Sequence, residues 1–231
     1  MSPYDDEDRA AGTLPDALPD TLPLFPLREA VLLPRARLPL NVFEPRYLAM
    51  VEHALANGRM IGMARPRFDD DVNPPLYEVG CAGRITSFME TDDGRFLLTL
   101  TGVSRFCLET DDLADGGFRL GRVDWHAYAM DRYPDPEETP ALRERILELL
   151  MDYLDEVGLK ADWDSIEGAS AETLINSVAM SCPFEAEEKQ AMLEARTLYD
   201  RGEALIALMQ MGIAERRGAE GRDDDRVERL Q

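Results

Sequence analysis

A change in the spacing of apolar residues divides this chain at the proline-rich segment YPDPEETP, residues 133–140. Before this segment the apolar runs are short and separated by turn residues, which is typical of β-strands. After it, apolar residues recur every three or four positions, which is typical of helices that bury one face. The sequence therefore predicts an α+β chain, with a mostly antiparallel β-subdomain over residues 22–131 and a helical bundle over 137–215.

Within the β-subdomain, one helix is expected near residues 45–57. Pro45 suits a first helical position, and Asn57-Gly58 suits an end. The residues between them place an apolar stripe on one face: Tyr47, Met50, Val51, Ala54 and Leu55. Asp93-Gly94 predicts a tight hairpin turn, because both residues tolerate positive φ.

Prolines and flanking patterns refine the expected strands. LPLFPL and LPLNVF each contain prolines, which lack an amide donor, so both are expected at sheet edges or in extended crossings. The segment FRLGRVDWHAYAM, which contains His126, is expected to be a strand. The sheet is therefore predicted to end close to Met130.

In the helical bundle, four helices are expected. The first carries a stripe from Leu142 to Val157 and stops near Gly158. Ser170 caps the second, and the third covers 185–193. Thr197 with Asp200 forms a capping box for the fourth.

Both ends of the chain are charged and poor in large apolar groups. Residues 1–21 are expected to form a disordered acidic tail, because so little burial does not offset the entropy of ordering the chain. Residues 216–231 are expected to form a loose charged tail. The first residues lack the basic and apolar regions of a secretory signal, so the sequence predicts a cytoplasmic protein.

The formal net charge of -21 limits the classes of partner. An anionic surface repels phosphate backbones and anionic lipids, so neither nucleic acid nor a membrane is an expected partner. The three cysteines, Cys81, Cys107 and Cys182, form no CxxC pair, so no zinc site is expected. The 45% hydrophobic content suffices for a core without a metal or other cofactor.

Two long segments carry a resemblance to a known family. LPLFPLREAVLLPRARLPLNVFEPRYLAMVEHALANGRMIGMA, residues 22–64, resembles the opening of the N-terminal domain of Lon proteases, and FEPRY is its most specific part. LINSVAMSCPFEAEEKQAMLEARTLYDRGEALIALM, residues 174–209, is similar to the helical half of that domain. The order and spacing of the two segments agree with the family.

The resemblance implies a PUA-like β-barrel followed by helices, in a non-catalytic module that binds unfolded or exposed polypeptide segments. No GxxxxGK[ST] phosphate loop occurs in the sequence, so ATP-independent binding is expected, as in a free-standing domain without the ATPase and protease parts. The Lon protease is a candidate partner. Two other hypotheses remain open at this point: a peptidase activity of its own, and RNA binding through the PUA-like fold.

The candidate substrate-binding residues lie at the FEPRY corner: Phe43, Arg46, Tyr47 and Met50. In a functional interpretation they border an apolar surface that accepts varied segments, since apolar contacts reject fewer sequences than buried hydrogen bonds do. In a structural interpretation, Pro45 starts the helix and Tyr47 packs in the core. The surrounding negative charge is expected to favour segments that are basic as well as apolar. The methionines are mostly expected in the core, and the histidines, cysteines and acidic runs are expected to have no catalytic or metal-binding role.

Overall fold

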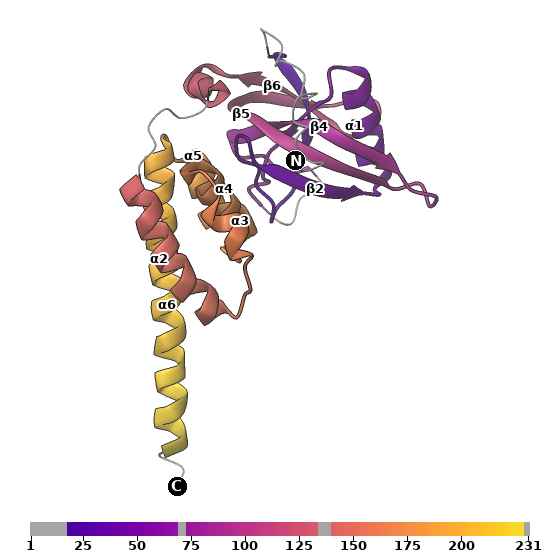
Figure 1. The fold of residues 1–231 in the computed structure, drawn as a ribbon. Coiled ribbons are helices and arrows are strands. Elements are labelled where there is room, and N and C mark those ends of the chain that lie inside the picture. Colours follow the sequence, from indigo (N-terminus) through magenta and orange to yellow (C-terminus); the bar gives the residue numbers. More distant parts are fainter. Residues whose placement is uncertain (1–17, 69–72, 134–139, 229–231) are drawn as a thin grey trace. The chain divides into compact units, whose positions relative to one another are not determined.

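The structure, a computed structural model, describes residues 18–68, 73–133 and 140–228, with the backbone alone for 164, 165 and 219–228. The chain forms two compact units (Figure 1). The first holds the described residues up to Leu27 and Leu32–Arg132, and the second holds Arg28–Val31 and the described residues from Tyr133 onward. Strands dominate the first unit and helices the second, so the predicted α+β class is confirmed.

The first unit, the β unit, contains six strands, an α-helix and a 3-10 helix within the described residues: β1 (Thr21–Phe25), β2 (Arg37–Val42), α1 (Pro45–Ala56), β3 (Met60–Met63), β4 (Val79–Glu90), β5 (Phe96–Leu113), β6 (Arg119–Asp124) and η2 (His126–Arg132). Pro45 starts α1 and Asn57 caps its end, as the sequence predicts. Gly94, with φ 78°, turns the chain between β4 and β5.

The sheet order is β2-β5-β4-β3-β1-β6, and β5 also pairs with β6. Strands β5, β4, β3, β1 and β6 therefore close into a barrel, and β2 extends the sheet beside the first half of β5. The pairing of β1 with β3 is parallel and the other pairings are antiparallel. The expected edge position is confirmed for β2 but wrong for β1, which lies between β3 and β6. Its Pro23 is tolerated because the β3 pairing involves only Leu24 and Phe25.

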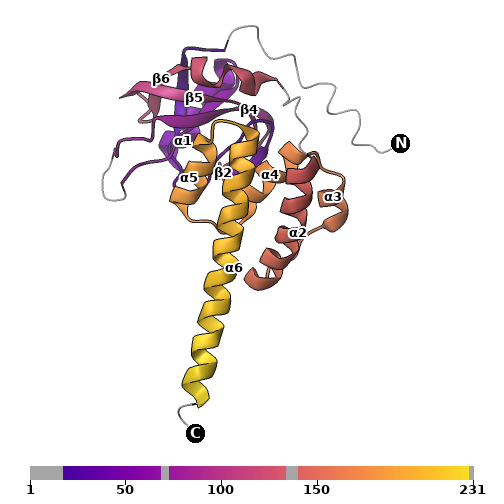
Figure 2. The same ribbon diagram turned by 90° about the vertical axis from the view of Figure 1, so that its left-hand side faces the viewer.

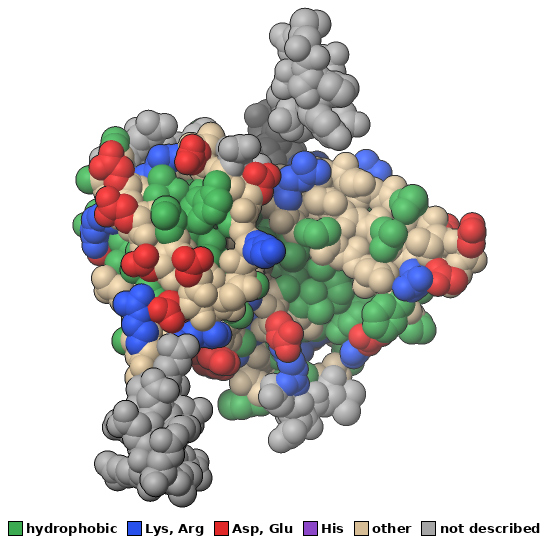
Figure 3. All heavy atoms as spheres, turned by 60° about the horizontal axis from the view of Figure 1, so that its bottom comes forward, with side chains coloured by type: hydrophobic (Ala, Val, Ile, Leu, Met, Phe, Trp, Pro, Cys, Tyr) green, Lys and Arg blue, Asp and Glu red, His purple; other side chains and the backbone are tan. Residues whose placement is uncertain are grey.

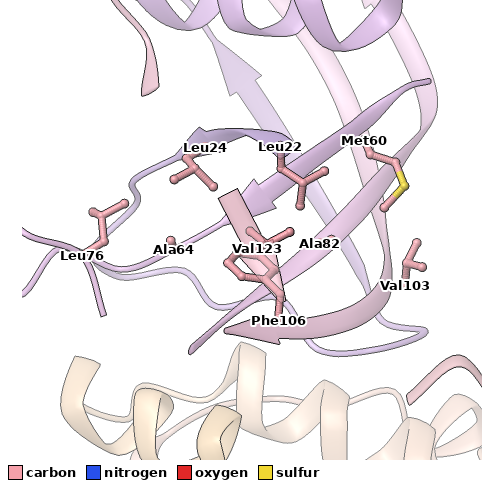
Figure 4. Close-up of a cluster of buried hydrophobic side chains, with 9 residues drawn as sticks. All are labelled: Leu22, Leu24, Met60, Ala64, Leu76, Ala82, Val103, Phe106 and Val123. Atoms are coloured by element: carbon pink, nitrogen blue, oxygen red, sulfur yellow. The ribbon is translucent and has the colours of Figure 1, made fainter. Parts of the chain in front are cut away.

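The barrel interior is filled by apolar side chains from all five of its strands, which point toward one another (Figure 4). Phe106 is 0% exposed, and the ring of Trp125 packs edge-on against it with centroids 6.0 Å apart. The indole Nε1 of Trp125 donates a hydrogen bond to the carbonyl of Pro19 at 3.1 Å, and Leu18 packs on the same core. The expected tail over 1–21 is therefore too long, because Leu18 to Thr21 are built into the barrel; residues 1–17 lie outside the described residues.

A buried ion pair fixes η2 against β5. The carboxylate of Asp131 accepts hydrogen bonds from the backbone N, Nε and Nη2 of Arg105 at 3.0, 2.7 and 2.8 Å. The guanidinium also lies 4.2 Å from the ring centre of Tyr128. These contacts require a compact turn after β6, so the expected strand through His126 is wrong: residues 126–132 form η2.

The second unit, the helical unit, has five helices among the described residues: α2 (Pro140–Val157), α3 (Trp163–Glu167), α4 (Ala171–Ser181), α5 (Ala186–Glu194) and α6 (Leu198–Glu228). The Ser170 cap accepts from the backbone N of Thr173, and Thr197 and Asp200 cap each other's backbone, as the sequence predicts. The short α3 was not expected. Helix α6 continues to Glu228 and extends past the other helices (Figure 2), so the loose tail expected from 216 is helical to that residue.

Helices α2 and α6 pack side by side in parallel. Arg145 pairs with Glu203 at 2.6 Å near the start of both helices, and a Cβ at Gly212 would meet the Tyr153 ring farther along. The buried guanidinium of Arg201 donates to the carbonyl of Met192 and to Oδ1 of Asn176, both at 2.9 Å, which ties α6 to α5 and α4. No helix in the described part of the chain combines the length and apolar character needed to cross a membrane.

We predict that Asp131→Ala destabilises the β unit by about 3–5 kcal/mol, because it leaves a buried guanidinium without its counter-charge. The exposed pair Asp93–Arg95 provides the control, and Asp93→Ala should leave the midpoint of unfolding nearly unchanged. Urea unfolding can be followed by the fluorescence of Trp125 in a Trp163→Phe background, since the chain has two tryptophans. Equal midpoints for the two alanine variants would contradict the structural role of Asp131.

Candidate functional site

An exposed sheet face lies where β2, β5 and β4 run side by side beyond the closed barrel (Figure 1). Side chains of a strand alternate between the two faces of its sheet. On one face they pack inward, and Phe96, Leu98 and Leu100 of β5 are 7%, 3% and 0% exposed. On the other they are exposed or half-buried. We call this second surface the open face and define it by these residues: Arg37, Pro39, Asn41, Arg84, Ser87, Met89, Leu97, Thr99 and Thr101.

A β-bulge in β4 determines which side chains reach the open face. The register shifts between Ile85, opposite Leu100, and Ser87, opposite Thr99. The extra residue is Thr86, whose hydroxyl lies within hydrogen-bond distance of the Thr99 carbonyl and the Thr101 hydroxyl. Because a one-residue shift exchanges the two faces of a strand, the bulge brings Met89 to the open face.

The open face changes character along β5. At one end, Thr101 lies opposite Arg37 on β2 and Arg84 on β4. At the other end, Leu97 lies opposite Asn41 and Met89. Met89 is 55% exposed, and Phe43, which by strand alternation continues this end after β2, is 63% exposed. The face thus runs from a basic end to an apolar end. We call Arg37 and Arg84 the arginine row, and Phe43, Leu97 and Met89 the apolar row.

The free edge of β2 is a poor template for another strand. Pro39 lies opposite Thr99 in the middle of β2 and has no amide hydrogen to donate. Because β2 pairs only with β5 among the described strands, Pro39 interrupts the edge that a polypeptide would have to extend. Binding through side chains on the open face is therefore favoured over strand addition.

The four residues predicted at the FEPRY corner separate into two groups. Phe43 is exposed beside the open face. Arg46 is half-exposed and engaged, because it pairs with Glu44 at 2.9 Å and lies 4.6 Å from the Tyr47 ring centre. Tyr47 and Met50 are 7% and 0% exposed, and burial is the main cause that raises the pKa of Tyr47. The prediction that Tyr47 and Met50 are surface residues is therefore wrong. Both pack in the core, as the structural interpretation expects.

None of the nine residues that define the open face was among the predicted site residues. Its charged and large apolar members are Arg37, Arg84, Met89 and Leu97. The signal was present in RFLLTLTG, where Leu97, Thr99 and Thr101 alternate with the buried residues of β5. Met89 could not be assigned from that pattern, because the bulge at Thr86 changes the alternation in β4.

Hydrophobic side chains also reach the surface of the helical unit (Figure 3). Met151, Tyr199 and Met211 are 56%, 51% and 56% exposed. Met151 belongs to α2, and Tyr199 and Met211 belong to α6, twelve positions apart. They provide matched controls for the open face.

The surroundings of Cys107, Cys182 and His53 are not those of an activated nucleophile or base. Burial raises the pKa of the Cys182 thiol to about 11, and burial with the nearby Asp124 and Glu78 raises the pKa of Cys107. Both shifts disfavour the thiolate, which is the opposite of an activated nucleophile. His53 packs its ring against Phe118 with centroids 5.3 Å apart. No cluster of three metal-ligating side chains occurs among the residues placed by the structure.

Comparison with known proteins identifies the family. The family model described as the ATP-dependent protease La (LON) substrate-binding domain matches residues 21–211, which is most of the chain and spans both units. The chain belongs to this family.

Curated relatives of this Lon family member are whole proteases. It is 25% identical to the Lon protease of Flavobacterium johnsoniae over 92% of this chain and 26% of that protein. It is 26% identical to the Lon protease of Desulfosudis oleivorans over 81% of this chain and 23% of that protein. The chain thus spans about a quarter of the length of these curated relatives.

Two solved structures share the fold of this chain. The Lon N-terminal domain protein from Xanthomonas campestris is 28% identical, with a TM-score of 0.57 over 81% of this chain and 97% of that chain. The N-terminal domain of the Mycobacterium avium complex Lon protease is 17% identical, with a TM-score of 0.60 over 82% of this chain and 98% of that chain. The second likeness shows the fold alone.

We predict a large loss of stability on substitution of Met50 and almost none on substitution of Phe43. Met50→Ala should destabilise the β unit by about 2–5 kcal/mol, because it opens a cavity under α1. Phe43→Ala should change stability by less than about 0.5 kcal/mol, because the ring is mostly in solvent. Denaturant unfolding of each variant measures the difference. A large loss of stability in Phe43→Ala would show that Phe43 is a packing residue and not available to a ligand.

Proposed function

We propose that this chain binds unfolded or exposed polypeptide segments on the open face of its β unit, without nucleotide and without cleaving them. The observation that carries the proposal is the apolar row: Met89 lies opposite Leu97, Phe43 directly follows β2, and Phe43 and Met89 are both more than half exposed. Membership of a substrate-binding family supports the same conclusion.

The chemistry of the open face suits a binder that tolerates many sequences. Exposed apolar side chains take up varied apolar segments, and a flexible methionine adapts to different shapes. The middle of the face carries the hydroxyls of Ser87 and Thr99, which lie opposite each other on β4 and β5. A site built on deeply buried hydrogen bonds would instead reject most sequences by leaving polar groups unpaired.

Two other functions have less support. A peptidase requires an activated nucleophile or a metal, and the raised thiol pKa values of Cys107 and Cys182 oppose the first. RNA binding requires a contiguous basic surface. Arg119 and Arg122 of β6 pair with Asp111 and Glu109, so β6 does not extend the basic end of the open face at Arg37 and Arg84.

The same reasoning assigns the wider role. A cytoplasmic module that holds exposed segments would act as an adaptor or modulator of proteolysis, and the Lon protease is the natural partner to test. Its strong net negative charge of -21 keeps such a module soluble while its apolar row is exposed.

We predict that Phe43→Ser with Met89→Ser weakens binding to an unfolded model protein, such as reduced and carboxymethylated lactalbumin, at least about tenfold, because two central apolar contacts are lost. The matched control is Met151→Ser with Tyr199→Ser, which removes similarly exposed groups from the helical unit. Affinity is measured by fluorescence anisotropy after thermal melting confirms that both variants are folded. Unchanged affinity in the first variant, or an equal loss in the second, would exclude the apolar row as the site.

We also predict that the purified protein neither binds ATP nor cleaves the unfolded protein that it binds. Titration calorimetry with ATP should give no heat of binding, and the bound protein should remain intact after incubation. Micromolar ATP affinity, or cleavage that is lost after a single substitution in this chain, would overturn the non-catalytic assignment.

A further inference from the structure

The two arginines of the open face differ from several other arginines that the structure describes. Arg105, Arg122 and Arg145 pair with Asp131, Glu109 and Glu203, respectively. By contrast, the side chains of Arg37 and Arg84 form no ion pair with any residue that the structure describes. Arg59, which precedes β3, shares this property within the same described part.

These unpaired charges lie close together. Arg37 and Arg84 are both opposite Thr101, one strand away on either side, so their Cα atoms are about 10 Å apart. Arg59 directly precedes Met60, the residue opposite Arg84, and lies outside the open face. The arginine row therefore concentrates positive charge at one end of the open face, in a chain whose net charge is -21.

Arg84 has an additional unmet requirement. Its Nε and Nη2 atoms are buried, and no acceptor among the described residues lies within hydrogen-bond distance of either. A buried guanidinium N–H without an acceptor is destabilising, whereas a carboxylate satisfies two such donors at once. The residue as a whole is only half-buried, so part of Arg84 is exposed at the open face.

We propose that the open face selects segments in which an acidic side chain lies four residues from an apolar one, the carboxylate on the arginine row and the apolar group on the apolar row. This inference rests on the proposed binding function and specifies its substrate. Thr101 and Leu97 are four residues apart on β5, which spans about 13 Å, and an extended peptide has the same repeat. Side chains i and i+4 of an extended segment project from the same face, so both rows can be contacted together.

The net charge of the chain favours the opposite selection, so the range of each interaction decides. The Debye length is about 8 Å at physiological ionic strength, so acidic groups farther away are largely screened. None of the residues that define the open face is acidic. A carboxylate in contact with Arg84 therefore experiences mainly the arginine row, and the expectation that basic segments are favoured is reversed at this site.

The test uses three labelled peptides that share an uncharged, apolar sequence and differ at one position, four residues from a central leucine: glutamate, glutamine or lysine. At 0.15 M salt we expect the glutamate peptide to bind about tenfold more tightly than the glutamine peptide, as for hydrogen bonds to charged groups. The lysine peptide should bind most weakly. Arg37→Gln with Arg84→Gln should bring the affinity ratio of the first two peptides close to one.

Controls separate this inference from the proposed function. Arg122→Gln, on β6, removes an exposed arginine that already has an acidic partner and should leave the affinity ratio unchanged. Arg37→Gln alone, at an exposed position, should lower the ratio even if Arg84→Gln impairs folding. Equal binding of glutamate and glutamine peptides, or preference for lysine, overturns the inference; if the glutamine peptide still depends on Phe43 and Met89, the proposed function stands. Failure of all three peptides to bind overturns both.

Discussion

The β unit depends on one long strand. Strand β5 runs from Phe96 to Leu113 and pairs with β2 and β4 in its first half and with β4 and β6 in its second. A straight strand of this length would not both close a barrel and extend a flat sheet beyond it. Register shifts beside Val103 and between Leu108 and Thr110 allow β5 to bend, so its first half leaves the barrel and carries the open face.

Close backbone contact at the bend restricts the residue type there. A Cβ at Gly102 would lie 2.0 Å from the carbonyl oxygen of Leu33, and the backbones of Gly102, Arg35 and Ala36 exchange hydrogen bonds. Arg105, two residues after Val103, forms its buried ion pair with Asp131. The strand is thus fixed on both sides of the bend, one side by backbone contact and the other by an ion pair. These contacts fix the point at which the first half of β5, and with it the open face, leaves the barrel.

Local signals in the sequence were sufficient for many element ends, but not for the η2 turn or the candidate site. Pro45, Ser170, Thr197 and the Asp93-Gly94 turn act on backbone groups within a few residues, so the ends of their elements could be predicted. The η2 turn depends on Asp131 reaching Arg105, 26 residues earlier, and no local pattern contains that contact. The same holds for the candidate site. Phe43 was predicted from a motif, whereas Arg37 and Arg84 come to lie on either side of Thr101 only through the register of three strands.

The two faces of the sheet carry separate sets of residues, so the proposed binding surface is compatible with a stable fold. The inward face of β5 is nearly completely buried at Leu98 and Leu100, so substitutions there act on stability. The open face bears the exposed Met89, the half-buried Leu97 and a row of hydroxyls, so substitutions there mainly change what the surface contacts. Strand alternation keeps the two sets of residues separate from Phe96 to Thr101 of β5. The bulge at Thr86 maintains this separation in β4, where an uninterrupted register would bring Phe88 to the open face and turn Met89 inward. Phe88 instead packs its ring against Phe96 on the inward side with centroids 5.0 Å apart, and the flexible Met89 lies on the face that we propose for binding.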